Sequence, residues 1–313
     1  MKWQGRQRSS NIEDRRGRGG LGGLAGGFGR GGGFGGGLGG GLGRSGGIGL
    51  PIGGRGGGIG SIVIIVIFIG IAMAFGINPL SILTGGGGGT TTNIPFQQTL
   101  PPQNADQNEL ADFVGVMVKD TEDFWGEYFR RQGDTYDAPT VVLFDQQTES
   151  GCGMADASSG PFYCPLDSKV YIDLTFYDQL RGQFGAPGDF AQAYVIAHEI
   201  GHHVQNLIGV LPEFNQARQS MTQEQANAAS VRVELQADCF AGAWAREEFE
   251  RGFLESGDID EAINAAHQIG DDRLTGGRVP HTQFTHGTSE QRMQWFRQGY
   301  DSGDPATCDT SNV

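Results

Sequence analysis

The residues best suited to chemistry lie in the stretch "AHEIGHHVQ", residues 197–205, which holds three of the chain's six histidines. His198 and His202 are four residues apart, so on an α-helix their side chains lie on one face, about one turn apart. Two imidazoles in this arrangement can bind one zinc ion. Glu199 follows at the position of a general base beside a metal-activated water. The spacing is the His-Glu-x-x-His motif and predicts a catalytic metal site.

A chance match to this motif is expected in about one chain in two hundred of this composition, so a third ligand is needed to support the site. The segment "VELQAD", residues 233–238, offers Glu234 and Asp238, again four apart on one helical face. We expect Glu234 to be the third ligand and Asp238 to accept the free N–H of a ligand histidine. The alternative is a solvated acidic face, but the neighbouring residues are mostly small or apolar, and a buried carboxylate needs a partner.

Two other residues of the motif have structural explanations. His203 is five residues from His198 and points away from it, beside an apolar stripe that should face the core. Gly201 has no side chain, which favours close packing of another helix. The stripe consists of Ala193, Ile196, Ile200, Val204 and Leu207.

The elements that must position these residues are mostly helical. Apolar residues recur at helical spacing in 108–131, and further helices are expected at 189–209, with Asp189 as the cap, and at 225–252, 258–270 and 289–300. Residues 139–145 and 169–177 are rich in β-branched and aromatic residues and are predicted to be strands. We therefore expect an α+β domain, residues 105–313, with a small sheet ahead of the histidine helix.

The N-terminal third has a different composition. Of the 55 glycines, many lie before residue 60, where nine basic residues face two acidic ones, although the whole chain carries −14. Residues 1–18 form a basic arm, residues 19–58 a Gly-rich tract expected to be disordered, and residues 79–104 a flexible linker. The arginines of the tract could contact anionic lipid or nucleic acid; a solvated tail is the simpler interpretation.

Residues 61–77, "SIVIIVIFIGIAMAFGI", carry no charge. With their flanks they predict a transmembrane helix at residues 59–78, because about 20 apolar residues span a bilayer core. A buried helix is the alternative. Positive charge precedes this run, so the basic arm is expected in the cytoplasm and the domain on the other side of the membrane.

All four cysteines follow the predicted span, which suggests two disulfides in an oxidising compartment. Cys152 and Cys164 enclose a short loop and are the favoured pair, which leaves Cys239 with Cys308. Four ordinary thiols remain the alternative.

The motifs resemble known metallopeptidases. "HEIGH" followed by "ELQAD" is similar to the gluzincin pattern, in which a glutamate on a second helix is the third zinc ligand. "THGTSEQR" resembles the His-Pro-x-x-x-x-Arg segment of membrane metalloproteases of the CAAX-processing and heat-shock type, with Gly287 in place of the usual proline.

The chain as a whole resembles the neutral zinc metallopeptidase family of bacterial membrane proteins. "WQGRQRSSNIEDRRG", "AHEIGHHVQ", "ELQADCFAGAWA" and "HGTSEQRMQWF" carry this resemblance over nearly the whole chain. It implies a zincin-like fold, one Zn²⁺ per chain and a zinc-dependent endopeptidase. His286, supported by Arg292, is then a candidate donor to the oxyanion of the tetrahedral intermediate.

The expected partners are a peptide or protein substrate, membrane lipid around one transmembrane helix and a cytoplasmic partner of the basic arm; nucleic acid is not expected. An extended substrate could pair with residues 169–177 by strand addition, although an ordinary paired structural strand explains them equally well. The expected location is the bacterial inner membrane, as a single-pass protein with the catalytic domain periplasmic or extracytoplasmic. The alternative function is a non-catalytic, zinc-stabilised membrane scaffold or binding module. A structural zinc site uses four protein ligands, so three ligands with Glu199 favour catalysis.

Overall fold

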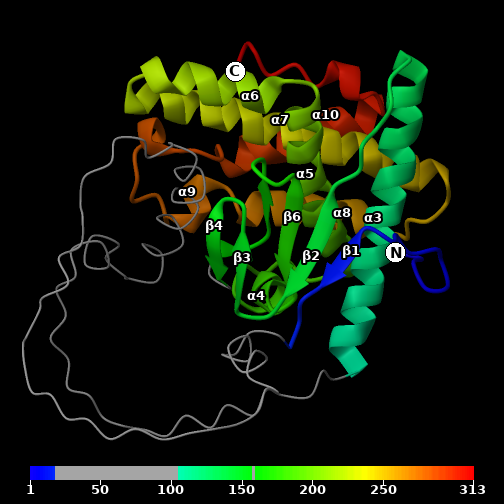
Figure 1. The fold of residues 1–313 in the computed structure, drawn as a ribbon. Coiled ribbons are helices and arrows are strands. Elements are labelled where there is room, and N and C mark those ends of the chain that lie inside the picture. Colours follow the sequence, from blue (N-terminus) through cyan, green and yellow to red (C-terminus); the bar gives the residue numbers. More distant parts are fainter. Residues whose placement is uncertain (18–104, 157–158) are drawn as a thin grey trace, which may run out of the picture.

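The computed structural model describes residues 1–17, 105–156 and 159–313, in which a small sheet lies against a larger assembly of helices (Figure 1). The four-stranded sheet has the order β1-β2-β6-β5. Strands β1, β2 and β6 are parallel, and β5 is antiparallel to β6. A separate hairpin pairs β3 with β4. The strands are β1 Ile12–Asp14, β2 Thr140–Phe144, β3 Gln147–Ser150, β4 Gly153–Asp156, β5 Phe162–Cys164 and β6 Lys169–Asp173.

Helices make up most of the described chain, which confirms the expected mostly helical α+β architecture. Two of the helices are long, α3 and α7, and α7 packs against both α5 and α10. The helices are α3 Ala105–Gln132, α4 Phe176–Gly182, α5 Asp189–Leu207, α6 Val210–Ala217, α7 Gln223–Glu250, α8 Asp258–Gln268, α9 Asp271–Leu274 and α10 Ser289–Ser302. Short 3₁₀ turns are η4 Arg218–Ser220, η5 His281–Gln283 and η6 Pro305–Thr307.

Helix α5 is central to the molecule, and its apolar face is buried as predicted, except at one end. Ala193, Ile196, Ile200 and Val204 are at most 1% exposed, whereas Leu207 is 37% exposed because the helix ends there. A Cβ atom at Gly201 would lie 3.2 Å from the Cα of Ala237 on α7. Glycine therefore allows the close approach of the two helices that carry the predicted ligands.

Side chains cap two of the helices around the site. Thr222 begins α7 and Thr288 begins α10, and each forms a capping box with a glutamine three residues later. Helix α5 differs from the expectation, because Gly188 is its N-cap and Asp189 is its first residue. The Asp189 carboxylate instead accepts hydrogen bonds from the amino group of Met1, at 2.8 and 2.9 Å.

The strand predicted at residues 169–177 is shorter and lies inside the sheet. It ends at Asp173, and helix α4 begins at Phe176. Because β2 and β5 pair with its two sides, the backbone of β6 has no free edge for a substrate strand. Of the two interpretations left open for this segment, the ordinary paired strand is the one observed, and β6 does not offer a strand-addition site.

The N-terminal residues are part of the fold rather than a separate arm. Strand β1 pairs in parallel with β2, with Ile12 opposite Val141. Met1 is 5% exposed. The domain boundary expected at residue 105 therefore omits residues 1–17. Two segments of one sheet cannot lie on opposite sides of a bilayer, so the expected separation of a cytoplasmic arm from an extracytoplasmic domain is incompatible with this fold (Figure 1).

The predicted transmembrane helix (residues 59–78), the Gly-rich tract (19–58) and the linker (79–104) lie outside the described residues. Within the ranges that are described, no helix combines the length and the apolar character needed to cross a membrane.

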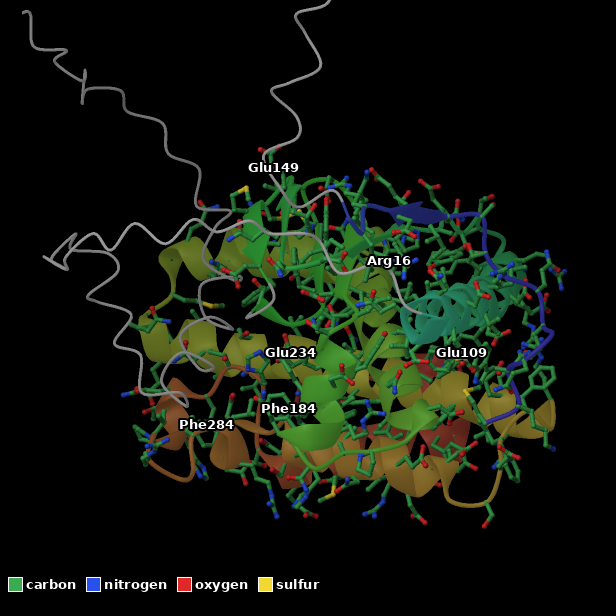
Figure 2. All side chains as sticks on the ribbon, turned by 90° about the horizontal axis from the view of Figure 1, so that it is seen from below. Arg16, Glu109, Glu149, Phe184, Glu234 and Phe284 are labelled. Atoms are coloured by element: carbon green, nitrogen blue, oxygen red, sulfur yellow. A yellow bond between two sulfur atoms is a disulfide. The ribbon has the colours of Figure 1, made fainter. Side chains whose placement is uncertain are left out.

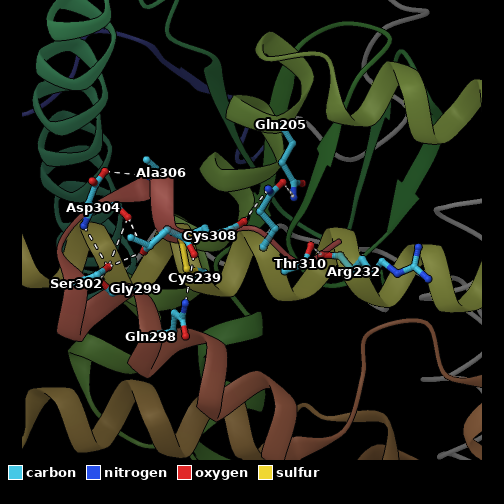
Figure 3. The surroundings of a disulfide bond; sticks show 12 residues. Gln205, Arg232, Cys239, Gln298, Gly299, Ser302, Asp304, Ala306, Cys308 and Thr310 are labelled. Atoms are coloured by element: carbon cyan, nitrogen blue, oxygen red, sulfur yellow. Dashed lines mark hydrogen bonds between the residues drawn. A yellow bond between two sulfur atoms is a disulfide. The ribbon is translucent and has the colours of Figure 1, made fainter. Parts of the chain in front are cut away.

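The four cysteines form two disulfides, Cys152–Cys164 and Cys239–Cys308, the pairs that the sequence favoured. The second bond joins the C-terminal segment to the middle of α7 (Figure 3). Beside it, the amide of Gln236 donates to the Cys308 carbonyl, and the Thr310 hydroxyl donates to the Arg232 carbonyl. The C-terminal residues are thus held along the helix that carries Glu234 and Asp238.

Candidate metal centre

The structure brings together the three predicted ligands from two helices. His198 and His202 project from α5 toward Glu234 on α7, which is labelled in Figure 2. One ligand atom from each residue lies within 4.8 Å of the other two. All three side chains are largely buried, with at most 13% exposure. Two nitrogens and one carboxylate oxygen are the donor set of many catalytic zinc sites.

The distances between donor atoms fit a metal ion. Nε2 of His198 lies 3.2 Å from one oxygen of Glu234, and Nε2 of His202 lies 3.6 Å from the other. Two ligands at about 2.1 Å from a tetrahedral zinc would lie about 3.4 Å apart. Each Nε2 atom therefore lies near this distance from an oxygen of Glu234, and one ligand atom from each of the three residues lies within 4.8 Å of the others.

Asp238 fixes the orientation of the His198 ring. One of its oxygens lies 2.8 Å from Nδ1 of His198, which leaves Nε2 directed at Glu234. The hydroxyl of Tyr194, one turn earlier on α5, donates to the same oxygen at 2.6 Å. This is the role expected for Asp238, and Tyr194 adds a donor that the sequence analysis did not identify.

Arg292 has a different contact from the expected one. From α10 its guanidinium donates two hydrogen bonds to Asp238, at 2.8 and 2.9 Å, and a third to the Tyr194 hydroxyl at 3.2 Å. Both Arg292 and Asp238 are at most 3% exposed. Arg292 was predicted to support His286. In the structure it instead supports Asp238, the aspartate behind His198.

These contacts set the pKa values of the buried groups. Burial alone would raise the pKa of Asp238, but Arg292 and His198 lower it to about 2. Burial lowers the pKa of His198, whereas Asp238 and Glu234 raise it to about 10. Glu234, which faces imidazoles, has a pKa well below its ordinary value despite its burial. A metal ion requires a neutral imidazole, so metal and proton compete for Nε2 of His198.

His202 is oriented from its own helix. Its Nδ1 lies 2.8 Å from the side-chain oxygen of Gln205, and the Gln205 amide donates to the Val233 carbonyl on α7 at 2.7 Å. Gln205 is completely buried. Gln205 therefore links His202 to α7, the helix that carries Glu234. The sequence analysis missed this residue, although its spacing of three residues from His202 on a helix could have indicated the contact.

Glu199 lies in the buried interior beside the cluster, with 8% exposure. Burial raises its pKa, and the neighbouring His202 and His198 oppose this. A carboxylate with a raised pKa is better able to hold a proton near neutral pH, which suits a general base.

His286 is held by Asp271 at the start of α9. Its Nδ1 lies 3.1 Å from one oxygen of Asp271, and the other oxygen accepts the backbone N–H groups of Thr285, His286 and Gly287. Burial lowers the pKa of His286, but Asp271 and Glu234 together raise it above the ordinary value. Arg292 was expected to support the His286 ring, but Asp271 does so in the structure. No motif or spacing in the sequence had indicated Asp271.

Gly287 adopts a conformation that proline cannot. Its φ is +92°, whereas a proline ring fixes φ near −65°. The turn after His286 therefore differs from the His-Pro turn of the proteins that this segment resembles.

His203 has the structural role that was expected. Its Nδ1 faces the hydroxyl of Tyr163 at 3.2 Å and its Nε2 faces the carbonyl of Asp137 at 2.6 Å, and the ring is 2% exposed. Burial lowers its pKa. The ring links α5 to the sheet and not to the metal ligands.

With this geometry established, comparison with known proteins identifies the family. A family model described as "Putative neutral zinc metallopeptidase" matches residues 1–311. The chain belongs to this family. The match includes residues 1–17 as well as the metal centre, in agreement with a single fold that contains both.

Two relatives illustrate the range of this family. The chain is 45% identical to the "Uncharacterized protein YpfJ" of Escherichia coli (strain K12), over 99% of this chain and 98% of that protein. It is 46% identical to the "Uncharacterized protein Mb2605" of Mycobacterium bovis, over 56% of this chain and 63% of that protein. No solved structure matches the chain. The family supports a zinc hydrolase, and the relatives' names specify no substrate.

Proposed function

We propose that this protein is a zinc-dependent endopeptidase in which His198, His202 and Glu234 bind one Zn²⁺ and Glu199 is the general base. The observation that carries the proposal is the spacing of the three donor groups, 3.2 and 3.6 Å, beside a fourth buried group, Glu199, with a raised pKa. A structural zinc site would use a fourth protein ligand, whereas this set leaves one position for a reactant.

A zinc ion bound there would polarise the scissile carbonyl and lower the pKa of a bound water to about 7. Glu199 accepts the proton of the attacking water on a carboxylate oxygen and transfers it to the leaving amine nitrogen. Burial raises the pKa of Glu199, which makes its carboxylate a stronger proton acceptor in this step.

His286 is the proposed donor to the carbonyl oxygen as negative charge develops on it. Asp271 binds Nδ1 of this ring and raises the pKa of His286, which favours the protonated, donating form. Arg292 is a positioning residue: it holds Asp238, and Asp238 holds His198.

The substrate is proposed to be a peptide or protein, as the family description suggests. Attachment to the inner membrane through residues 59–78 stays a prediction from the sequence. If it holds, the catalytic domain and residues 1–17 lie on the same side of that membrane, because they share one sheet.

The proposed function is tested by digestion of an unbiased peptide library with the full-length, zinc-loaded protein and its Glu199→Gln variant. The variant keeps the shape of the site and its ligands but lacks the base. We expect zinc content to stay unchanged and turnover to fall by at least about 100-fold, the usual contribution of a general base.

Glu213→Gln is the matched control, since Glu213 is an exposed glutamate on α6, and it should cleave like the wild type. Equal cleavage by wild type and Glu199→Gln would contradict the role of Glu199. Cleavage by neither protein at any pH from 5 to 9 would favour the zinc-stabilised scaffold.

A further inference from the structure

Residues 1–17, here called the N-terminal segment, lie across three elements that are distant in sequence. Its strand β1 pairs with the outer side of β2, and the Ser9 amide donates to the Gly115 carbonyl of α3 at 2.9 Å. The Lys2 amide donates to the Phe253 carbonyl, just beyond α7, at 2.8 Å. The segment thus covers a surface formed by α3, the C-terminal end of α7 and the edge of β2 (Figure 1).

Arg6 is the charged centre of this contact. Its guanidinium binds Asp120 of α3 and Glu248 of α7, and it stacks on the Phe253 ring at 3.4 Å from the ring centroid. The side chains of Asp120 and Glu248 are 4% and 0% exposed. Arg6 contacts one oxygen of Asp120, and the other oxygen has no hydrogen-bond partner among the described residues.

Without Arg6, two buried carboxylates would face each other with less positive charge than they need. Arg251 contacts Glu248 at 3.1 Å, but no bond links Arg251 to Asp120 in the described structure. Leaving a buried charge unpaired is strongly destabilising. With the segment in place, Arg6 is therefore the cation that bridges these two buried carboxylates.

Arg16 closes the other end of the segment. Asp14 holds its guanidinium at 2.7 and 3.0 Å, and that group donates to the Gln107 carbonyl in the first turn of α3 at 2.7 Å. Figure 2 labels Arg16 near the ribbon of α3. The chain therefore leaves the described fold after residue 17 and re-enters it at residue 105 within a small region.

We propose that the surface formed by α3, the end of α7 and the β2 edge is a receptor for the N-terminal segment, with Arg6 as its specificity-determining residue. The segment is then a reversibly bound peptide ligand of the domain, joined to it through residues 18–104. The occupant is residues 1–17 of the same chain, which supply both the strand and the cation that bridges the two carboxylates. The proposal does not depend on the metal chemistry.

The test uses the full-length protein with a specific protease site inserted between Gly33 and Phe34, ahead of the apolar run at 61–77. Cleavage frees a fragment that no membrane or detergent micelle can retain through that run. We expect this fragment to co-elute with the rest of the protein on size exclusion. Loss of the fragment from the wild type on cleavage would overturn the proposal.

The specificity of Arg6 is tested by overnight competition with synthetic peptides of residues 1–17, while the cleaved protein keeps its native sequence in residues 105–313. The wild-type peptide should displace the fragment. Arg6→Glu should need a concentration at least about 30-fold higher, since loss of a buried charge partner weakens binding by that factor or more.

Arg8→Glu is the matched control, because Arg8 pairs with Asp112 at the exposed surface, where both side chains are more than half exposed. This peptide should compete like the wild type. Equal competition by the Arg6→Glu and Arg8→Glu peptides would show that Arg6 sets no specificity. Failure of the wild-type peptide to exchange would overturn reversible binding.

Discussion

Helix α7 carries two buried charge clusters, and they differ in the number of cations that face their carboxylates. In its middle, Glu234 and Asp238 face two imidazoles and Arg292. Near its end, Glu248 faces Asp120; Arg6 contacts both carboxylates, and Arg251 contacts Glu248 alone. The first cluster lies where α5 and α10 meet α7, and the second lies where the N-terminal segment crosses it.

The pKa values of the two clusters shift in opposite directions. Partners lower the pKa of Asp238 to about 2, whereas burial and Glu248 raise that of Asp120 to about 7. Burial acts in the same direction on both carboxyls, so the neighbouring charges decide the difference: Arg292 and His198 beside Asp238, and the anion Glu248 beside Asp120. The middle of α7 is thus organised to hold a negative ligand set in place, and its end is organised to receive a cation from elsewhere in the chain.

The largest effect should follow from removing the cation of the first cluster. Arg292→Ala leaves the buried carboxylate of Asp238 without its guanidinium partner. Removing one partner of a buried ion pair costs about 3–5 kcal/mol of unfolding free energy. Urea denaturation measures it. Arg297→Ala on the same helix is the control, since Arg297 is exposed, and it should change stability by less than about 0.5 kcal/mol. Similar losses in the two variants would remove the distinction between a buried cation and a surface one.

The next effect concerns the disulfide beside the first cluster. Replacing both Cys239 and Cys308 with serine should cost about 2–5 kcal/mol, because the bond closes a long loop. It should also speed zinc loss to a chelator, since Cys239 follows Asp238 directly on α7 (Figure 3).

The matched control replaces Cys152 and Cys164, which close a shorter loop near the β3–β4 hairpin. This variant should lose stability but retain zinc as the wild type does. Equal zinc loss from both double variants would break the link between the Cys239–Cys308 bond and the metal centre.

The smallest effect is expected at the second cluster, and it should depend on pH. Burial and Glu248 raise the pKa of Asp120, Asp123 adds to the rise, and Arg6 and Arg251 oppose it. A raised carboxyl pKa favours the folded state at low pH, and this contribution is lost as pH rises from about 4 to about 7. Removing Arg6 raises the pKa further.

Arg6→Gln should therefore cost about 1–3 kcal/mol at pH 8, and less at pH 5, where the Asp120 carboxyl is protonated in the folded state. Denaturation at the two pH values measures this difference. Arg8→Gln is the control and should show no such dependence. A deficit in Arg6→Gln that grows toward pH 5 would contradict the account of the second cluster.

The first cluster was accessible to sequence reasoning because its geometry is local. Spacings of four residues place His198 with His202, and Glu234 with Asp238, on single helical faces, whatever the rest of the fold. The contact of Arg292 with Asp238 instead depends on how α10 packs on α7, which no local spacing determines. Tyr194 lies one turn before His198 and could have been found by the same spacing.

The second cluster was not accessible in this way. More than one hundred residues separate Arg6 from Asp120, and Asp120 from Glu248. Their contact depends on how residues 1–17 pack on the domain, including the parallel pairing of β1 with β2. Basic residues followed by a Gly-rich tract are typical of a segment outside the fold, and residues 1–18 were interpreted as a basic cytoplasmic arm. Nothing in the periodicity of "NIEDRR" indicates that Ile12–Asp14 completes a sheet.

The central claim is that α5 and α7 jointly bind one zinc ion, and metal analysis of the full-length protein after dialysis against zinc tests it most directly. We expect about one zinc per chain in the wild type and in Glu213→Ala, and little in Glu234→Ala, which retains two of the three ligands. Asp238→Asn should bind zinc about 10- to 100-fold more weakly, because the change affects only the orientation of His198. Full zinc occupancy in Glu234→Ala, with wild-type affinity, would contradict the assignment of the metal centre.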